Sequence, residues 1–208
     1  DNFPVLSILD PKIVNNMPKS VLKSSGADLI VHTLESFMST QKTVETEFLS
    51  LNAFAKIDTS LKKLLVNKGS IKDWENVQWA CVWSMIAMAN SSAGPSSAFS
   101  YLLGTHYGIP HGIAGAFFLK KIVFYNIRHN YKFEKLFPNK KNITKKFLEN
   151  YFNNLFKLCS IPDKIQELGV YKEKDYVIFS NFYKTIVKTF SFNPIKINKK
   201  DFLKIIFE

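Results

Sequence analysis

Cysteine is scarce in this chain, because its 208 residues include only Cys81 and Cys159. Two cysteines and no visible signal peptide exclude a small secreted fold held by disulfides, so we expect a reducing, cytoplasmic location. Long apolar runs are also missing, since none reaches the roughly 18 residues of a membrane span. The most apolar stretch, residues 79–89, fits a buried core helix, and we expect no membrane association.

Arginine is nearly absent as well, because Arg128 is the only one in a chain with a formal net charge of +11. Residues 120–208 carry 19 Lys and Arg against eight acids, whereas residues 1–119 carry nine of each sign. Base readout and bidentate phosphate binding favour arginine over lysine. The pattern therefore favours a solvated basic face over a nucleic-acid surface, and we expect no nucleic-acid partner.

Several short motifs of catalysis and nucleotide binding are missing. The chain has no P-loop, no G-x-G-x-x-G after a strand and no G-x-S-x-G elbow. Cys81 has no obvious base beside it and reads as a packing residue. These residues alone therefore show neither a nucleotide site nor an activated nucleophile.

The apolar pattern predicts an all-α fold, a multi-helix bundle of about seven to nine helices. Residues 71–90 are apolar around most of their circumference, which is typical of a central helix. Residues 3–9 read as a strand or an extended segment that ends in a turn. Residues 91–110 are rich in Gly, Pro and Ser, so we expect irregular chain or short helices where a site can lie. The expected helices are 20–39, 45–66, 71–90, 112–129, 142–159, 163–168, 174–190 and 199–207.

Four residues are candidates for metal binding. Asp28 and His32 are four apart on one expected helix, which places both side chains on one face within reach of one cation. An exposed helix pair has the same spacing, so this pattern alone is weak. His111 follows Pro110 at a helix start and reads equally as a ligand or a surface cap. His106 lies nearby, whereas His129 reads as solvated.

Three segments, taken in order, resemble one family. Residues 10–37 contain Asp10-Pro11, Met17-Pro18 and the run from Gly26 through Asp28 and His32 to Phe37, similar to the first signature of iron-containing (group III) alcohol dehydrogenases. Residues 103–116 look like the second signature, which contains Pro-His-Gly. Asn193-Pro194 and residues 197–202 resemble the closing segment. The resemblance thus covers the chain from end to end.

The resemblance implies the C-terminal helical domain of the dehydroquinate synthase-like, iron-containing alcohol dehydrogenase fold. Residues 11–208 would form this metal-binding domain, and residues 1–10 would lead in from an N-terminal nucleotide-binding domain absent from these residues. The family binds a divalent metal, Fe²⁺ or Zn²⁺, through one Asp and three His. Three of these positions match here, whereas the fourth is a serine and the position of a proton-relay histidine is a tyrosine. The matching ligands are Asp28, His32 and His111, the fourth position is Ser97 and the relay position is Tyr101.

The same resemblance implies a function. The chain would be the metal-binding catalytic half of an NAD(P)-dependent alcohol dehydrogenase acting on a small alcohol or aldehyde, with the metal as Lewis acid. Residues 94–104 look most like a subgroup acting on sugar acids, which includes 3-deoxy-manno-octulosonate 8-oxidase. NAD(P) would be held mainly by the absent domain, so we expect this chain alone to be inactive. Lys19 and Ser24 near the domain junction are weaker candidates, and a homodimer is implied. The alternative is a non-catalytic helical remnant or interaction module.

Overall fold

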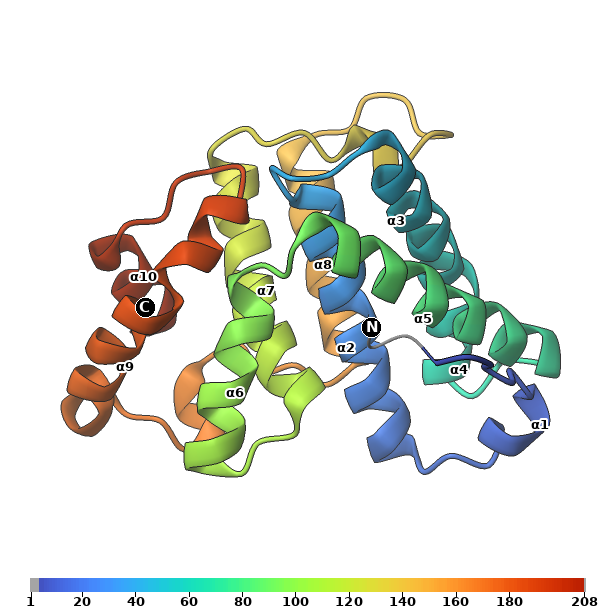
Figure 1. Cartoon of the computed structure of the whole chain (residues 1–208), viewed down its shortest axis with the longest axis horizontal. Coiled ribbons are helices and arrows are strands. Elements are labelled where there is room, and N and C mark those ends of the chain that lie inside the picture. Colours follow the sequence, from blue (N-terminus) through green and yellow to red (C-terminus); the bar gives the residue numbers. More distant parts are fainter. Residues whose placement is uncertain (1–3, 208) are drawn as a thin grey trace.

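The computed structural model describes residues 4–207, and every regular element in that range is a helix (Figure 1). The predicted all-α class is therefore confirmed. Four short segments have 3₁₀ or π geometry: η1 (Ile57–Leu61, π), η2 (Glu134–Leu136), η3 (Ile165–Leu168) and η4 (Val187–Phe192). The α-helices are α1 (Pro11–Val14), α2 (Lys19–Met38), α3 (Val44–Lys56), α4 (Lys62–Leu65), α5 (Ile71–Ser91), α6 (Pro95–Tyr107), α7 (His111–Arg128), α8 (Lys145–Leu158), α9 (Lys172–Ile186) and α10 (Lys199–Phe207).

Helices α2 and α7 form the centre of the bundle. They pack on each other, with α3 and α5 against α2 on one side and α6 against α7 on the other (Figure 1). Ile30 and Leu34 of α2 and Phe117 and Leu119 of α7 are completely buried. Both helices are buried around most of their circumference, which explains why they carry few charged residues. Their tight packing also holds in place the side chains that lie where α2 meets α7.

Helix α5 is not the central helix that its sequence predicts. It packs on α2 and α3 through small residues, and Ala80 and Ala87 are completely buried. Trp79 and Met85 are exposed on the other side. Cys81 is exposed too, so the prediction that it is a packing residue was wrong. Apolar composition alone does not reveal which side of a helix is buried, because folded proteins also expose much apolar surface.

Irregular chain or short helices were expected in residues 91–110, and most of this range forms one helix, α6. Pro95 stands in its first turn, where the missing N–H costs nothing. Gly108 ends the helix in the left-handed conformation (φ 65°), which glycine adopts without strain. Gly94, Pro95 and Gly108, three of the residues that suggested a loop, therefore lie at the two ends of a 13-residue helix.

Other boundaries differ less from the prediction. The helix expected at 45–66 is α3, η1 and α4 in direct succession, and the one expected at 163–168 is the 3₁₀ segment η3. Residues 4–10 form neither helix nor strand, and Phe3 lies outside the described residues. Instead of a turn, Asp10 caps α1 by accepting a hydrogen bond from the Lys12 N–H at 2.8 Å.

Phenylalanine side chains hold the outer helices to the centre. The Phe99 ring of α6 lies 4.5 Å from Phe118 of α7, and Phe118 lies 5.6 Å from Phe202 of α10. On the other side, Phe54 of α3 lies 6.4 Å from Phe152 of α8. Burying one such side chain contributes roughly 1.5–3 kcal/mol, so these contacts help to hold the outer helices in place.

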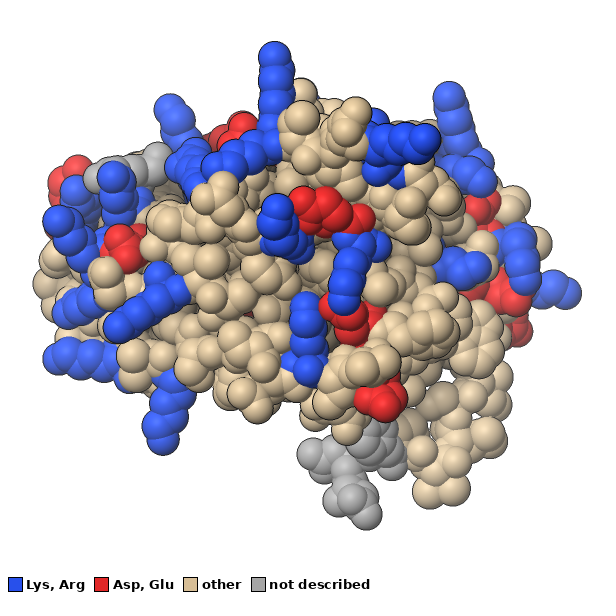
Figure 2. Space-filling view, turned by 90° about the horizontal axis from the view of Figure 1, so that it is seen from above, with Lys and Arg blue, Asp and Glu red and all other residues tan. Residues whose placement is uncertain are grey.

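The net positive charge comes from residues 120–208. Figure 2 shows Lys and Arg side chains scattered over one face, with Asp and Glu among them. No helix within residues 4–207 combines the length and apolarity needed to cross a membrane.

Candidate metal centre

Asp28, His32 and His111 converge where α2 meets the start of α7. Asp28 Oδ1 lies 3.6 Å from His32 Nε2 and 3.8 Å from His111 Nε2. The i, i+4 spacing on α2 brings the first pair together, and the packing of α7 on α2 brings the third. The structure therefore places all three predicted ligands beside one another.

A close approach of the two helix backbones positions His111. A Cβ added to the neighbouring Gly112 would lie 1.9 Å from the Ser24 carbonyl oxygen and 3.0 Å from Asp28 Cβ. No side chain fits there, so glycine is required for α7 to begin directly against α2. Ser24 thus contributes its backbone, whereas Lys19 is exposed at the start of α2.

The environment of Asp28 fits a bound cation. Its Oδ1 is buried and has no hydrogen-bond partner, an arrangement that is costly unless something else satisfies the oxygen. Two ligands bound tetrahedrally at about 2.1 Å from one ion lie about 3.4 Å apart, a few tenths of an ångström below the two distances above. Among residues 4–207, no group of three or more His, Cys, Asp and Glu side chains lies close enough together to hold a metal ion. Binding therefore requires the three side chains to close slightly.

His32 is suited to be a neutral ligand. Burial lowers its pKa, Asp28 opposes that change and His111 adds to it. A lowered pKa leaves the imidazole unprotonated at neutral pH, which is the form that binds metals.

His111 has two neighbours on α6. The Ser100 hydroxyl lies 3.1 Å from both ring nitrogens, and the Tyr101 ring stands edge-on at 5.2 Å between centroids. Tyr101 is 66% exposed. The predicted relay residue therefore lies beside a predicted ligand and faces solvent.

The Ser97 hydroxyl is engaged by Glu35. It donates a hydrogen bond of 2.7 Å to the Glu35 carboxylate, which also accepts from the backbone N–H groups of Gly94, Ser96 and Ser97. The carboxylate thus caps the N-terminus of α6, where a negative charge is favoured. Burial raises the pKa of Glu35, and the hydrogen bonds from Ser97 and Ser96 oppose this.

Glu35 is the residue that the sequence reasoning missed. It lies in the first signature, three residues after His32. Its spacing carried a signal, because Asp28, His32 and Glu35 are at i, i+4 and i+7 on one face of α2. The other candidates lie elsewhere: His106 contacts Thr105 at 3.0 Å, and exposed His129 donates to the Tyr125 carbonyl at 2.8 Å.

Known proteins share both the sequence and the fold. A 1,3-propanediol dehydrogenase of Citrobacter freundii is 28% identical over 98% of this chain and 54% of its own length. An alcohol dehydrogenase of Thermococcus barophilus is 29% identical over 86% of this chain and 45% of its own. The crystal structure of a 1,3-propanediol oxidoreductase superposes with a TM-score of 0.85 at 25% identity, over 98% of this chain and 55% of that one. The chain therefore spans about half the length of the relatives it matches.

The match to a family model covers nearly the whole chain. The model described as the C-terminal part of the Fe-containing alcohol dehydrogenase family matches residues 23–208. That range includes Asp28, His32, Glu35 and His111, and so contains the whole candidate site. The chain therefore belongs to the iron-containing alcohol dehydrogenase family and corresponds to its C-terminal helical domain.

Proposed function

We propose that this chain is the metal-binding half of an NAD(P)-dependent alcohol dehydrogenase, with Asp28, His32 and His111 holding one divalent cation. The observation that carries the proposal is the buried, unpartnered Oδ1 of Asp28 between two imidazoles. A cation supplies the missing partner, whereas no group of the described chain does. Domain boundaries at residues 1–10 and 11–208 belong to the same proposal.

The bound metal would act as a Lewis acid for an alcohol or aldehyde oxygen. The chain's own residues do the rest: Asp28 and His32 hold their positions through the buried α2, and Gly112 keeps His111 close to them. Tyr101, beside His111 and open to solvent, would exchange a proton with water; its contact with His111 and its exposure support this role. Small alcohols suit this proposal, because relatives are named 1,3-propanediol and NADPH-dependent butanol dehydrogenases. A sugar-acid substrate, a homodimer and a cytoplasmic location stay predictions.

One observation favours the alternative, a non-catalytic helical module. Ser97 occupies the position of the fourth family ligand, and its hydroxyl donates a hydrogen bond to Glu35. Three ligands still suit a catalytic ion, because such sites keep a coordination position open for water or substrate. The alternative therefore depends on whether the three-ligand site binds metal at all.

Metal analysis of the purified chain separates the two functions. After anaerobic loading with Fe²⁺ or Zn²⁺ and removal of excess ion, we expect one bound metal per chain. His32→Ala and His111→Ala should each lower metal affinity by at least about tenfold, because each removes a ligand. His129→Ala is the matched control, since it removes an exposed imidazole from the far end of α7.

Absence of stoichiometric metal in the wild type, or equal loss in all three variants, would contradict the metal site. Activity is then tested by supplying the N-terminal domain of a relative together with NAD⁺ or NADP⁺ and 1,3-propanediol. We expect turnover only in the combined protein loaded with metal, since the chain alone carries no phosphate loop.

A further inference from the structure

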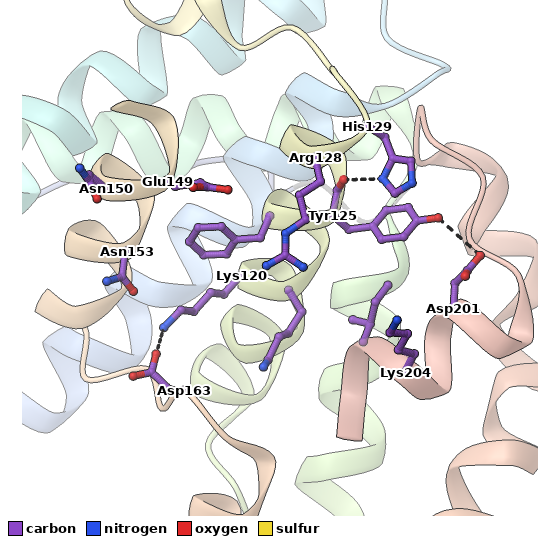
Figure 3. Close-up of a pocket in the computed structure, with 13 residues that line it drawn as sticks. Lys120, Tyr125, Arg128, His129, Glu149, Asn150, Asn153, Asp163, Asp201 and Lys204 are labelled. Carbon is purple, nitrogen blue, oxygen red and sulfur yellow. Dashed lines mark hydrogen bonds and ion pairs between the residues drawn. The ribbon is translucent and has the colours of Figure 1, made fainter. Parts of the chain in front are cut away.

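A cavity opens toward the end of α7 that lies away from His111, and neither the candidate metal centre nor the family match assigns it a role. It has a volume of about 810 Å³ and lies between α7, α8 and α10 (Figure 3). At a rise of 1.5 Å per residue, Lys121 is about 15 Å and Arg128 about 26 Å along α7 from His111. The cavity is thus remote from the candidate metal centre and independent of the proposed function.

One face of α7 forms the floor of this cavity. Lys121, Phe124, Tyr125 and Arg128 follow the i, i+3, i+4, i+7 pattern and all line it. Two cations therefore stand at either end of an aromatic surface. The wall from α8 adds two amides, Asn150 and Asn153, which can donate and accept hydrogen bonds.

The cations in the cavity are only partly neutralised. Lys120, which is nearly buried, is paired with Asp163. Neither Lys121 nor Arg128 forms an ion pair within residues 4–207. Burial lowers the pKa of Lys121, the neighbouring charges of Lys120 and Arg128 lower it further, and Asp163 partly opposes them. An anion between Lys121 and Arg128 would relieve this repulsion.

The carboxylates of the cavity do not remove this preference. Asp163 is matched by Lys120, and Asp201 accepts hydrogen bonds from the Tyr125 hydroxyl and the Asn198 N–H, both at 3.4 Å. Only Glu149, on the α8 side, remains without a hydrogen bond or ion pair within the described chain. Its negative charge would weaken the binding of an anion, so removing that charge should strengthen binding.

We propose that the cavity between α7, α8 and α10 binds a small phosphate monoester. The planar guanidinium of Arg128, the only arginine of the chain, matches two phosphate oxygens, and Lys121 adds a second positive charge. Phe124 and Tyr125 offer their surface to the organic part of the ester, and the two asparagines to its hydroxyl groups. A site so far from His111 would regulate or localise the protein rather than take its substrate.

Calorimetric titration of the whole chain with ribose 5-phosphate and with inorganic phosphate, at constant ionic strength, tests the proposal. We expect saturable binding of both at one site per chain, with the ester at least about threefold tighter. Arg128→Gln should weaken ribose 5-phosphate binding at least about tenfold, which corresponds to losing a charged hydrogen-bonded pair. Arg128→Lys should recover only part of it, since it keeps the charge and loses the planar fork.

Two further variants separate a built site from diffuse surface charge. Glu149→Gln should strengthen binding several-fold, because it removes the opposing charge. Lys68→Gln removes an equal charge from an exposed loop outside the cavity and should change affinity less than twofold. The site would be overturned if Lys68→Gln and Arg128→Gln weakened ribose 5-phosphate binding equally. It would also be overturned if chloride bound as tightly as ribose 5-phosphate. Equal affinity for ribose 5-phosphate and inorganic phosphate would overturn the assignment to an ester.

Discussion

Gly112 of α7 and Ser24 of α2 touch backbone to backbone, beside the candidate metal ligands. A Cβ on Gly112 would lie 1.9 Å from the Ser24 carbonyl oxygen, far inside van der Waals contact. The partner is main chain rather than a flexible side chain, so the clash is relieved only by separating the helices. The distance between Asp28 and His111 therefore depends on this glycine.

Replacing Gly112 with alanine should lower the free energy of unfolding by about 1–3 kcal/mol or more, as overpacking does. It should also lower metal affinity, because His111 moves away with α7. Chemical denaturation and metal titration measure the two effects. Gly104→Ala is the control: its nearest contact would be 3.7 Å, and helical Gly→Ala changes are neutral or stabilising. A Gly112→Ala protein as stable as the control would contradict the close approach.

Ser97→Ala should destabilise the fold without weakening metal binding. The change removes the 2.7 Å hydrogen bond to buried Glu35, which costs about 1–3 kcal/mol for a charged acceptor. Metal affinity should stay within twofold, because the hydroxyl faces Glu35. Thr105→Ala on the same helix removes only a local bond to the Tyr101 carbonyl and serves as control. A large loss of metal affinity in Ser97→Ala would make the serine a ligand after all.

Glu35 should make stability depend on pH. Burial raises its pKa in the folded state above the ordinary 4.5. A raised acid pKa means that the folded chain binds the proton more tightly, so the contribution is fully present below pH 4.5 and is lost as pH rises through the folded-state pKa. Relative to Glu35→Gln, the wild type should therefore gain stability as pH falls from about 8 to 4.5. Urea denaturation of both proteins gives this difference, in which the other acids cancel.

If wild type instead loses stability relative to Glu35→Gln as pH falls, the hydrogen bonds from α6 affect the pKa of Glu35 more than its burial does. The carboxylate would then be held ionised, and its pKa in the folded chain would lie below 4.5. Glu35→Asp keeps the charge but shortens the reach to α6, so it should be destabilised at every pH.

The helices were predictable from sequence because their apolar residues repeat with the helical period. Bounds for α2 and α7 fell within one or two residues, since both are buried on most sides and carry an unbroken pattern. The extent of α6 was not predicted, because part of what stabilises its start is not local. Glu35, 59 residues before Gly94, supplies its cap, and no rule of sequence spacing joins the two.

The candidate site likewise has a part that local spacing predicts and a part that depends on tertiary packing. Asp28 and His32 were predictable as a pair, because four residues is a local distance on a helix. The resemblance alone joined His111 to them, since tertiary packing brings it to α2. The hydrogen bond from Ser97 to Glu35 was not predictable, because a serine at a ligand position does not indicate which group its hydroxyl will bond. Likewise α5 misled the prediction, because its composition does not reveal its exposed side.

Lys120 offers a last prediction, about a buried charge. Its side chain is 7% exposed, and its ammonium is paired with Asp163, whose own side chain is 78% exposed. Asp163→Asn should destabilise the fold, because it leaves the nearly buried ammonium without its counter-charge. Lys120→Met should be close to neutral, because a methionine fills similar space and leaves Asp163 in water. Thermal melts of the two variants should therefore differ clearly, although each removes the same ion pair. Equal loss in both would mean that the attraction itself, rather than the burial of Lys120, sets the cost.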